Sequence, residues 1–407
     1  MGDNKIQKNL LSRYAKVLVW GLETARKSTN GQGYKPGDIV WLRFEREAIK
    51  LAEYVYQELI SKGLHVTQQI VLTTSMEKTL YDLGSDEQLG FVSPWSETMY
   101  QHVNGLISLR APSSLTHLKH IDSGKMVMVS KAFKHLHDIM DAREASGDFG
   151  WTLCMMPTNA LAKQAKMTKA EYEQEIIKAC YLHENNPVAK WQQIYEDSQT
   201  IKKWLNALKV NYFHIESANA DLKVYLGRRR KWLGISGHNI PSFEIFVSPD
   251  CRKTEGVYFA NMPSFRNGNY VRNVRLEFSQ GSVVKATAED GEEFLNAQLS
   301  TDEGSRRLGE FSLTDKRFSP ITKFMANILF DENVGGENGN CHIAVGSSFA
   351  GTYNGNQMQL TPELKKALGF NDSAMHWDLI NTESKIVTAH LKGGGQIVIY
   401  ENGEFKY

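Results

Sequence analysis

The pattern that most constrains the fold is a strand–helix–strand succession near the start of the chain. Residues 38–44 form a mostly apolar run, which is typical of a buried strand. Apolar residues then recur at helical spacing from Ala48 to Ile60, and Gly63 stands where such a helix would end. A second strand is predicted over residues 65–71. Two strands joined by one helix predict a parallel sheet, because the chain must cross over before it can run in the same direction again.

The remaining pattern divides the chain into two halves of different character. The first half continues with helices and strands, which we expect at 10–22, 105–110, 132–140, 151–156, 169–183 and 189–208. The second half consists of short strands and turns, with strands expected at 212–216, 222–226, 271–278, 282–287, 382–390 and 396–401. We therefore expect an α/β domain with a mostly parallel sheet over residues 1–208 and a β-rich α+β domain over residues 209–407. The boundary is expected between residues 205 and 212.

The composition argues against several classes of partner. The chain carries 47 basic and 46 acidic residues, a net charge of +1, so it lacks the positive field that holds a nucleic-acid backbone. No run of 18 apolar residues occurs, so we expect no membrane span. Residues 1–16 are charged and do not have the pattern of a signal peptide. The four cysteines are far apart and form no CxxC pair, which favours a reducing, cytoplasmic location.

Residues with metal-ligand chemistry gather in the second half, whereas the glycine motifs of nucleotide-binding proteins and of serine hydrolases do not occur. The clearest signal is His376 and Asp378, which are separated by one residue in a predicted strand. Alternate side chains of a strand share a face, so this imidazole and this carboxylate would point the same way. The pair suits a divalent ion. Taken alone, however, such a pair is more often two surface residues or a hydrogen-bonded couple.

Three further carboxylates and a second histidine stand in strand-like or loop-like settings. Glu332 and His342 border a glycine-rich loop, and such a loop allows close approach to an ion. Each has an ordinary alternative, a capping or ion-paired glutamate and a hydrogen-bonded buried histidine. Glu310 stands at the start of a strand beside two arginines, where an ordinary ion pair is the alternative. Glu244 interrupts an apolar run, so it is either solvated at a strand edge or held by a positive partner.

Together these residues amount to four carboxylates and two histidines in one predicted domain. Such a set is too large for one structural zinc ion. It fits two divalent ions that share a carboxylate, and Zn²⁺, Co²⁺, Mn²⁺ and Mg²⁺ all accept oxygen ligands with one or two histidines. Two ions at a separation of about 3.5–4 Å activate water and polarise a carbonyl group.

At these same positions the sequence resembles the thermophilic metallo-aminopeptidases, the group of aminopeptidase T, aminopeptidase II and aminopeptidase S. The resemblance is carried by IPSFEIFVSPDCRKTEG at 240–256, STDEGSRRLGE at 300–310, SPI at 319–321, LFDEN at 329–333, CHIAVGSSF at 341–349 and MHWDL at 375–379. It covers essentially the whole second domain. In the first domain it continues more loosely through YKPGDIVWLRFEREAIKLA.

This resemblance implies a cytoplasmic homodimer that removes N-terminal residues from peptides with a dinuclear metal centre. The first domain would cover the cleft or build the dimer contact, and the second would hold the metal. The ligands implied by the matching motifs are Glu244, Glu310, Glu332, His342, His376 and Asp378. We expect Glu310 to serve in proton transfer as well, and either Glu310 or Asp378 to bridge the two ions.

The sequence departs from the family pattern in two places. Phe349 stands where the family usually has a tyrosine, so any role of that hydroxyl is absent or moves to Tyr353, our second candidate for a catalytic residue. The loop before His342 is longer than in the thermophilic members and could offer Glu337 as a substitute ligand. Cys251, which also lies in a motif, is expected to be a bystander.

Two other functions stay open on the sequence alone. The first is a non-catalytic protein of the same fold that binds a metal ion or a peptide, a reading supported only by Phe349. The second is a two-metal phosphoesterase, which uses similar ligands. A phosphoesterase would need more aspartate and histidine residues and a basic phosphate pocket, neither of which the sequence offers.

Overall fold

The computed structural model describes residues 2–29, 31–266 and 268–407, which form two compact units. The first unit contains the chain up to Trp191 together with Ser236–Pro241, and the second contains Gln192–Ile235 and Ser242–Tyr407. The chain thus leaves the first unit within helix α9 (Pro187–Ala207) and returns to it briefly. The assignment of functional domains to residues 1–208 and 209–407 stays a prediction.

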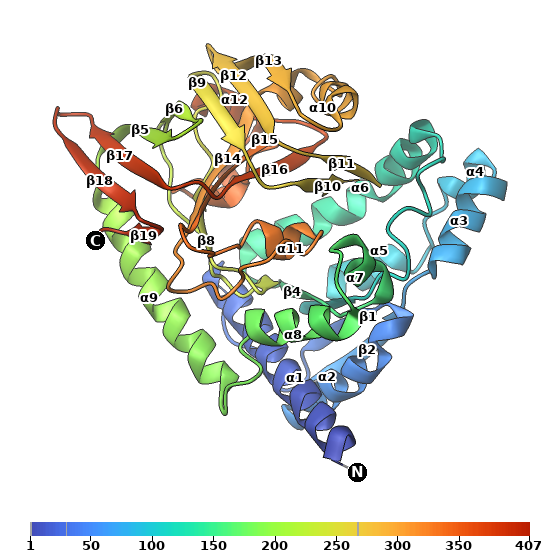
Figure 1. Ribbon diagram of the computed structural model, residues 1–407. Coiled ribbons are helices and arrows are strands. Elements are labelled where there is room, and N and C mark those ends of the chain that lie inside the picture. The colour runs from blue at the N-terminus through green and yellow to red at the C-terminus, as the bar shows by residue number, and fades with distance from the viewer. Residues whose placement is uncertain (1, 30, 267) are drawn as a thin grey trace. The chain divides into compact units, whose positions relative to one another are not determined.

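The first unit is built on a parallel sheet, as the strand–helix–strand pattern predicted. Its five strands lie in the order β2-β1-β3-β4-β7, and all four pairings are parallel. Figure 1 labels β1, β2 and β4 of this sheet. The strands are β1 (Ile39–Phe44), β2 (His65–Ile70), β3 (Gly105–Arg110), β4 (Gly150–Met155) and β7 (Asn239–Ile240). The helices are α1 (Gly2–Ser28), α2 (Ile49–Ser61), α3 (Thr74–Leu83), α4 (Asp86–Leu89), α5 (Ser96–His102), α6 (Ser123–Ser146), α7 (Asn159–Gln164) and α8 (Lys169–Ala179), with a 3₁₀ turn at Arg46–Ala48.

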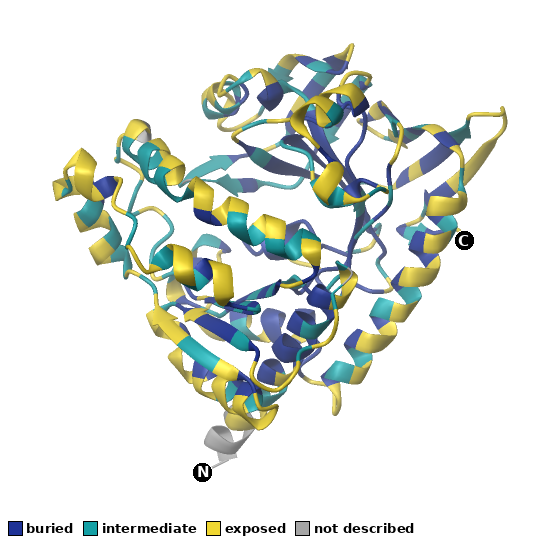
Figure 2. Cartoon of the chain, turned by 180° about the vertical axis from the view of Figure 1, so that it is seen from behind, coloured by how far each residue is buried: buried dark blue, intermediate teal, exposed yellow. Residues whose placement is uncertain are grey.

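Helix α1 lies close against this sheet. Leu18 and Leu22, four residues apart on one face, are fully buried, and the helix contacts β3 and β4. Between them Gly21 allows close approach, because a Cβ atom there would lie 2.9 Å from the carbonyl oxygen of Gly237. Figure 2 shows the corresponding alternation of buried and exposed residues along the helices.

The helices α3 to α5 were not predicted from the apolar pattern. They are short, and several of their large apolar side chains or neighbours, such as Leu83 and Trp95, are exposed, so no buried stripe marks them. The signal that the sequence does contain is capping. Thr73 caps α3, and Ser85 forms a capping box with Gln88 at the start of α4.

The second unit contains an eight-stranded sheet in the order β13-β12-β9-β6-β5-β17-β18-β19, paired antiparallel throughout. Its strands are β5 (Val210–Ser217), β6 (Asp221–Tyr225), β9 (Glu255–Ala260), β12 (Val274–Ser279), β13 (Ser282–Thr287), β17 (Lys385–Leu391), β18 (Gln396–Glu401) and β19 (Glu404–Phe405). The predicted hairpin of β5 and β6 is confirmed. The predicted strand at 271–278 is instead divided, because Asn273 adopts a φ of +52° between β12 and the small hairpin of β10 (Ser264–Arg266) and β11 (Asn269–Val271).

A four-stranded antiparallel sheet in the order β16-β15-β14-β8 forms the centre of this unit. Its strands are β8 (Glu244–Val247), β14 (Leu308–Thr314), β15 (Asn340–Gly346) and β16 (His376–Asn381). Every residue of β14 and β15 is buried. The two sheets pack through aromatic rings, with Phe213 and Phe311 5.4 Å apart between their centroids and Trp232 edge-on to both.

The remaining helices of the second unit are short. They are α10 (Glu292–Gln298), α11 (Ile328–Asp331) and α12 (Pro362–Leu368), with 3₁₀ turns at Glu303–Arg306, Ala350–Thr352 and Gln357–Gln359. Within the described residues, no helix has the length and apolar character that a membrane crossing requires. The fold is therefore mixed α/β with a parallel sheet first and antiparallel sheets after it, which confirms the predicted fold class.

Candidate metal centre

The four-stranded sheet brings together five of the six predicted ligand side chains. Glu244 begins β8, Glu310 lies in β14, His342 lies in β15, and His376 and Asp378 lie in β16. Glu310 and Asp378 stand opposite the same residue of β15, Ala344, and His342 lies two positions from it on the same face. Adjacent strands in this register bring side chains from distant parts of the chain to one spot.

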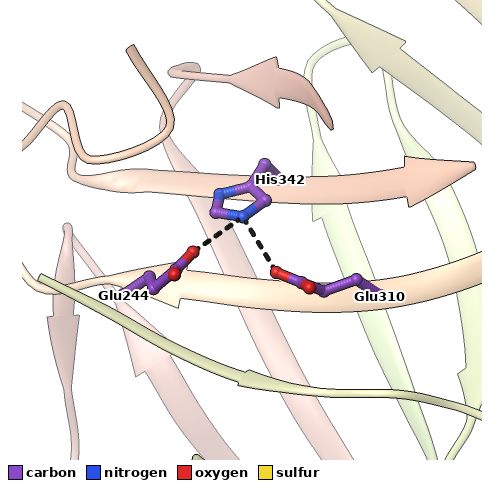
Figure 3. Close-up of side chains that lie close together, drawn as sticks. All are labelled: Glu244, Glu310 and His342. Carbon is purple, nitrogen blue, oxygen red and sulfur yellow. Dashed lines mark hydrogen bonds and ion pairs between the residues drawn. The ribbon is translucent and has the colours of Figure 1, made fainter. Parts of the chain in front are cut away.

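One group of side chains surrounds His342. Its Nε2 atom lies 3.3 Å from Oε2 of Glu244 and 3.3 Å from Oε1 of Glu310 (Figure 3). A ligand atom from each of the three residues lies within 4.8 Å of the others, a spacing at which they could hold one metal ion.

A second group surrounds His376 and shares a member with the first. The Nε2 atom of His376 lies 3.3 Å from Oδ1 of Asp378 and 3.6 Å from Oε2 of Glu310. These three residues also meet the 4.8 Å spacing. The two oxygens of Glu310 therefore face different groups, one toward each histidine.

Glu332 lies near the two groups without belonging to either within that spacing. It follows α11 directly, and its Oε1 atom accepts a hydrogen bond of 3.3 Å from the side chain of Asn333. Burial raises the pKa of Glu332 well above its usual value, and the negative charges of Glu244 and Asp378 raise it further.

The cluster is almost closed to solvent. The side chains of His342 and Glu310 are 0% and 4% exposed, and only His376, at 27%, has substantial exposure. Burial raises the pKa of Glu310 to about 7, opposed by its hydrogen bond with His342 and reinforced by Glu244. An ionised carboxylate at this depth requires a nearby positive charge.

The two histidines supply that charge when no metal ion is bound. Burial lowers the pKa of His342, but the hydrogen bonds to Glu244 and Glu310 outweigh it and hold the pKa well above its usual value. Burial also opposes protonation of His376, but Asp378 raises its pKa to about 9. Carboxylate oxygens with imidazole nitrogens are ligands that Zn²⁺, Co²⁺ and Mn²⁺ accept, and the raised pKa values show that this cluster of carboxylates favours positive charge. The residues therefore fit a divalent metal site.

Neighbouring groups orient both imidazole rings. Nδ1 of His376 lies 2.8 Å from the carbonyl oxygen of Ser347, so it must carry the hydrogen. The side-chain amide of Asn340 donates to the carbonyl oxygens of Glu332 (3.0 Å) and Val334 (2.7 Å), which turns its Oδ1 toward Nδ1 of His342 at 3.3 Å. Both histidines thus keep a hydrogen on Nδ1, and in the neutral form that binds a metal ion they present the lone pair of Nε2 to the cluster.

Asn340 was not singled out from the sequence. The available signal was its position two residues before His342, on the same face of the same strand.

The other residues considered from the sequence lie outside the two groups. Tyr353 is buried in an apolar cluster with Leu360, Leu368 and Phe370, so its catalytic role stays a prediction. Glu337 is exposed in the loop before β15, and Cys251 is buried and belongs to neither group. The ring of Phe349 lies against that of His376, with 5.3 Å between centroids.

Comparison with known proteins gives consistent matches over most of the chain. The model of the thermophilic metalloprotease family M29 matches residues 7–405. Aminopeptidase AmpS of Bacillus subtilis is 31% identical over 307 residues, which are 71% of this chain and 74% of that protein. Aminopeptidase PepS of Streptococcus thermophilus is 25% identical over 98% of both chains. The structure of wild-type AmpT from Thermus thermophilus has the same fold, with a TM-score of 0.80 at 21% identity over 98% of this chain and 100% of that one.

Proposed function

Since the chain belongs to the thermophilic metalloprotease family M29 and its relatives are aminopeptidases, we propose that it removes N-terminal residues from peptides. The reaction would use two divalent ions held by the second unit. The observation that carries the number of ions is the position of Glu310. Its carboxylate belongs to two ligand groups at once, and its two oxygens face different histidines. A carboxylate in this position suits a bridge between two ions.

The proposed ligands follow from the two groups. Glu244, Glu310 and His342 would hold one ion, and Glu310, His376 and Asp378 the other. Glu332 completes the proposed set, supported by its electrostatic interaction with the buried carboxylates. Zn²⁺, Co²⁺, Mn²⁺ and Mg²⁺ all remain candidates for the native ion. Bound divalent ions supply Lewis-acid polarisation of the substrate carbonyl and lower the pKa of water.

The chain's own residues would transfer protons and exclude bulk water. Glu310 stays the candidate for proton acceptor and donor in the alternative in which the ions leave one of its oxygens free, because a carboxylate with both oxygens on cations binds protons too weakly. It would take a proton from the attacking water and pass one to the leaving amine. The near-complete burial of Glu310 and His342 keeps bulk water away from these groups. Tyr353 stays the second candidate.

We further propose that the enzyme acts in the cytoplasm as a homodimer. The first proposal rests on four free, buried cysteines, and the second on the resemblance to the family.

Removal and restoration of metal tests the function directly. The protein is dialysed against a chelator, assayed with leucyl and tyrosyl anilides, and assayed again after addition of Zn²⁺, Co²⁺ or Mn²⁺. We expect activity to disappear and to return with at least one ion, with mass spectrometry of the active protein giving two ions per chain. Activity that survives complete metal removal would refute the proposal. A protein that binds ions but hydrolyses no substrate with any of them would favour a non-catalytic binding role.

A further inference from the structure

The buried cluster reaches solvent on the side of His376. Its side chain is 27% exposed, against 11% for Glu244 and 12% for Asp378, while Glu310 and His342 are almost completely covered. A substrate that approaches the two ligand groups must therefore arrive past His376, and whatever lines this opening contacts the substrate.

Phe349 lines this opening. Its ring stands edge-to-face against the ring of His376, with 5.3 Å between centroids and an interplanar angle of 81°. Its other aromatic neighbour is Phe246, at 5.4 Å. Phe246 lies two residues after Glu244 in β8, so both side chains point to the same face of the sheet. Two phenyl rings thus border the polar cluster directly.

The Phe349 ring combines a large apolar surface with substantial exposure. The residue is 48% exposed, and exposed aromatic surface beside a cluster of polar groups is the usual composition of a ligand subsite. Val284 and Ile397, two other exposed apolar residues, lie on strands of the eight-stranded sheet, whereas the two ligand groups lie in the four-stranded sheet.

The position of Phe349 is held by its backbone on both sides. Its N–H donates to Oγ of Ser248 at 2.8 Å, and Ser248 is fully buried. Its carbonyl oxygen accepts a hydrogen bond of 2.8 Å from the hydroxyl of Thr352. The segment that carries the ring is thus fixed before any substrate binds, which reduces the entropy that binding would cost.

We propose that Phe349, supported by Phe246, is a specificity-determining residue whose exposed ring receives the side chain of the substrate's first residue. This inference rests on the proposed aminopeptidase function. In an N-terminal residue the side chain branches from the carbon between the amine and the scissile carbonyl. It must therefore lie within a few ångströms of the ligand groups, which is where the Phe349 ring stands. An uncharged aromatic surface favours large apolar and aromatic side chains over small ones and over carboxylates.

The test compares substrates that differ only in this side chain. With the metal-restored enzyme, kcat/KM is measured for the phenylalanyl, leucyl and alanyl anilides in the wild type and in Phe349→Ala and Phe349→Leu. We expect kcat/KM of the wild type to be at least about tenfold higher for the phenylalanyl than for the alanyl substrate, which is the discrimination that one to a few buried methylene groups provide. Phe349→Ala should bring this ratio to within threefold of one, mainly by loss on the phenylalanyl substrate. Phe349→Leu, which keeps an apolar surface, should retain most of it.

Two controls separate a specificity role from general damage. Tyr407→Ala removes another exposed aromatic residue and should leave the ratio unchanged. Metal content measured by mass spectrometry should be the same in all variants. An equal fall on both substrates in Phe349→Ala, or an unchanged ratio, would overturn the proposal.

A binding measurement keeps this inference distinct from the proposed function. Calorimetry with L-phenylalaninamide and L-alaninamide reports the subsite even if no anilide is hydrolysed. Tighter binding of the aromatic amide in the wild type but not in Phe349→Ala would support the subsite on a protein without peptidase activity. Equal affinities in the wild type would overturn the subsite even if the enzyme is an active aminopeptidase.

Discussion

The shared carboxylate Glu310 gives a prediction in which metal-free and metal-loaded protein respond in opposite directions. In the metal-free protein, burial raises the pKa of Glu310 from 4.5 to about 7. At about 1.36 kcal/mol for each pKa unit, this change corresponds to roughly 3 kcal/mol. The side chain is almost completely buried, so solvent does not reduce this figure by much.

The sign of the pH dependence follows from where the proton is held. The folded protein keeps the Glu310 proton to a higher pH than the unfolded chain does. Binding of this proton therefore stabilises the folded state fully below pH 4.5, and this contribution to the free energy of unfolding is lost as the pH rises through 7. Glu310→Gln has no such proton to lose. Relative to the wild type, the metal-free variant should therefore gain up to roughly 3 kcal/mol in the free energy of unfolding between pH 4.5 and pH 7.5.

Metal should reverse the order. An ion present at a hundred times its dissociation constant stabilises the folded wild type by about 2.7 kcal/mol. Glu310→Gln weakens both ligand groups, so it should gain little. The assay is urea denaturation followed by fluorescence, in chelator and in Zn²⁺, at several pH values. Glu255→Gln is the matched control, because this carboxylate lies in the same unit and instead accepts a hydrogen bond from the backbone of Gln280. The reasoning fails if the metal-free wild type and Glu310→Gln show the same pH dependence, or if the variant responds to metal as fully as the wild type.

Three further predictions concern other parts of the chain. Asn340→Ala releases Nδ1 of His342 and should weaken metal binding about 10- to 100-fold by calorimetry, whereas an unchanged affinity would exclude a positioning role. Burial lowers the pKa of Lys202 to about 8, so folded protein releases this proton before the unfolded chain does and stability should rise between pH 8 and 10.5. Lys202→Met should reduce that rise in thermal melts without abolishing it, because burial also lowers the pKa of Lys385 to about 8, and an undiminished rise would show that Lys202 does not contribute. Gly21→Ala should destabilise the protein by about 1–3 kcal/mol in urea denaturation because its Cβ meets a backbone carbonyl. Gly33→Ala should change stability little, because its Cβ would meet only the flexible Lys27 side chain, at 3.7 Å.

The elements that the sequence predicted well have strong local patterns. The run at 38–44 and the helical spacing from Ala48 onward reappear as β1 and α2, because a parallel sheet covered by helices leaves continuous apolar runs. The short helices between β2 and β3 were not predicted, because they bury too few side chains to give the sequence a helical spacing of apolar residues. Apolar spacing indicates only helices with a buried face, whereas α3 and α4 are indicated by their capping residues.

The candidate metal centre could be predicted from the sequence in its residue types but not in its geometry. His376 and Asp378 could be placed on one face from the strand period alone, and the structure brings their side chains within 3.3 Å. That Glu310 lies between both histidines depends on the register of β14 with β15, a long-range pairing that no local pattern encodes. Asn340 was missed for a related reason, since its role depends on a turn that brings Glu332 and Val334 to its amide.

The order in which the central sheet is assembled limits when an ion can first be captured. β8 and β14 contribute only Glu244 and Glu310, while both imidazoles arrive with β15 and β16, much later in the chain. A nascent chain that has emerged only as far as β14 therefore offers two of the proposed ligands, both carboxylates, and two carboxylates alone bind divalent ions weakly and with little selectivity. Under the proposed ligand assignment, the first group is complete only when β15 has joined the sheet and the second only when β16 has, so the ions would be acquired late in the folding of this unit.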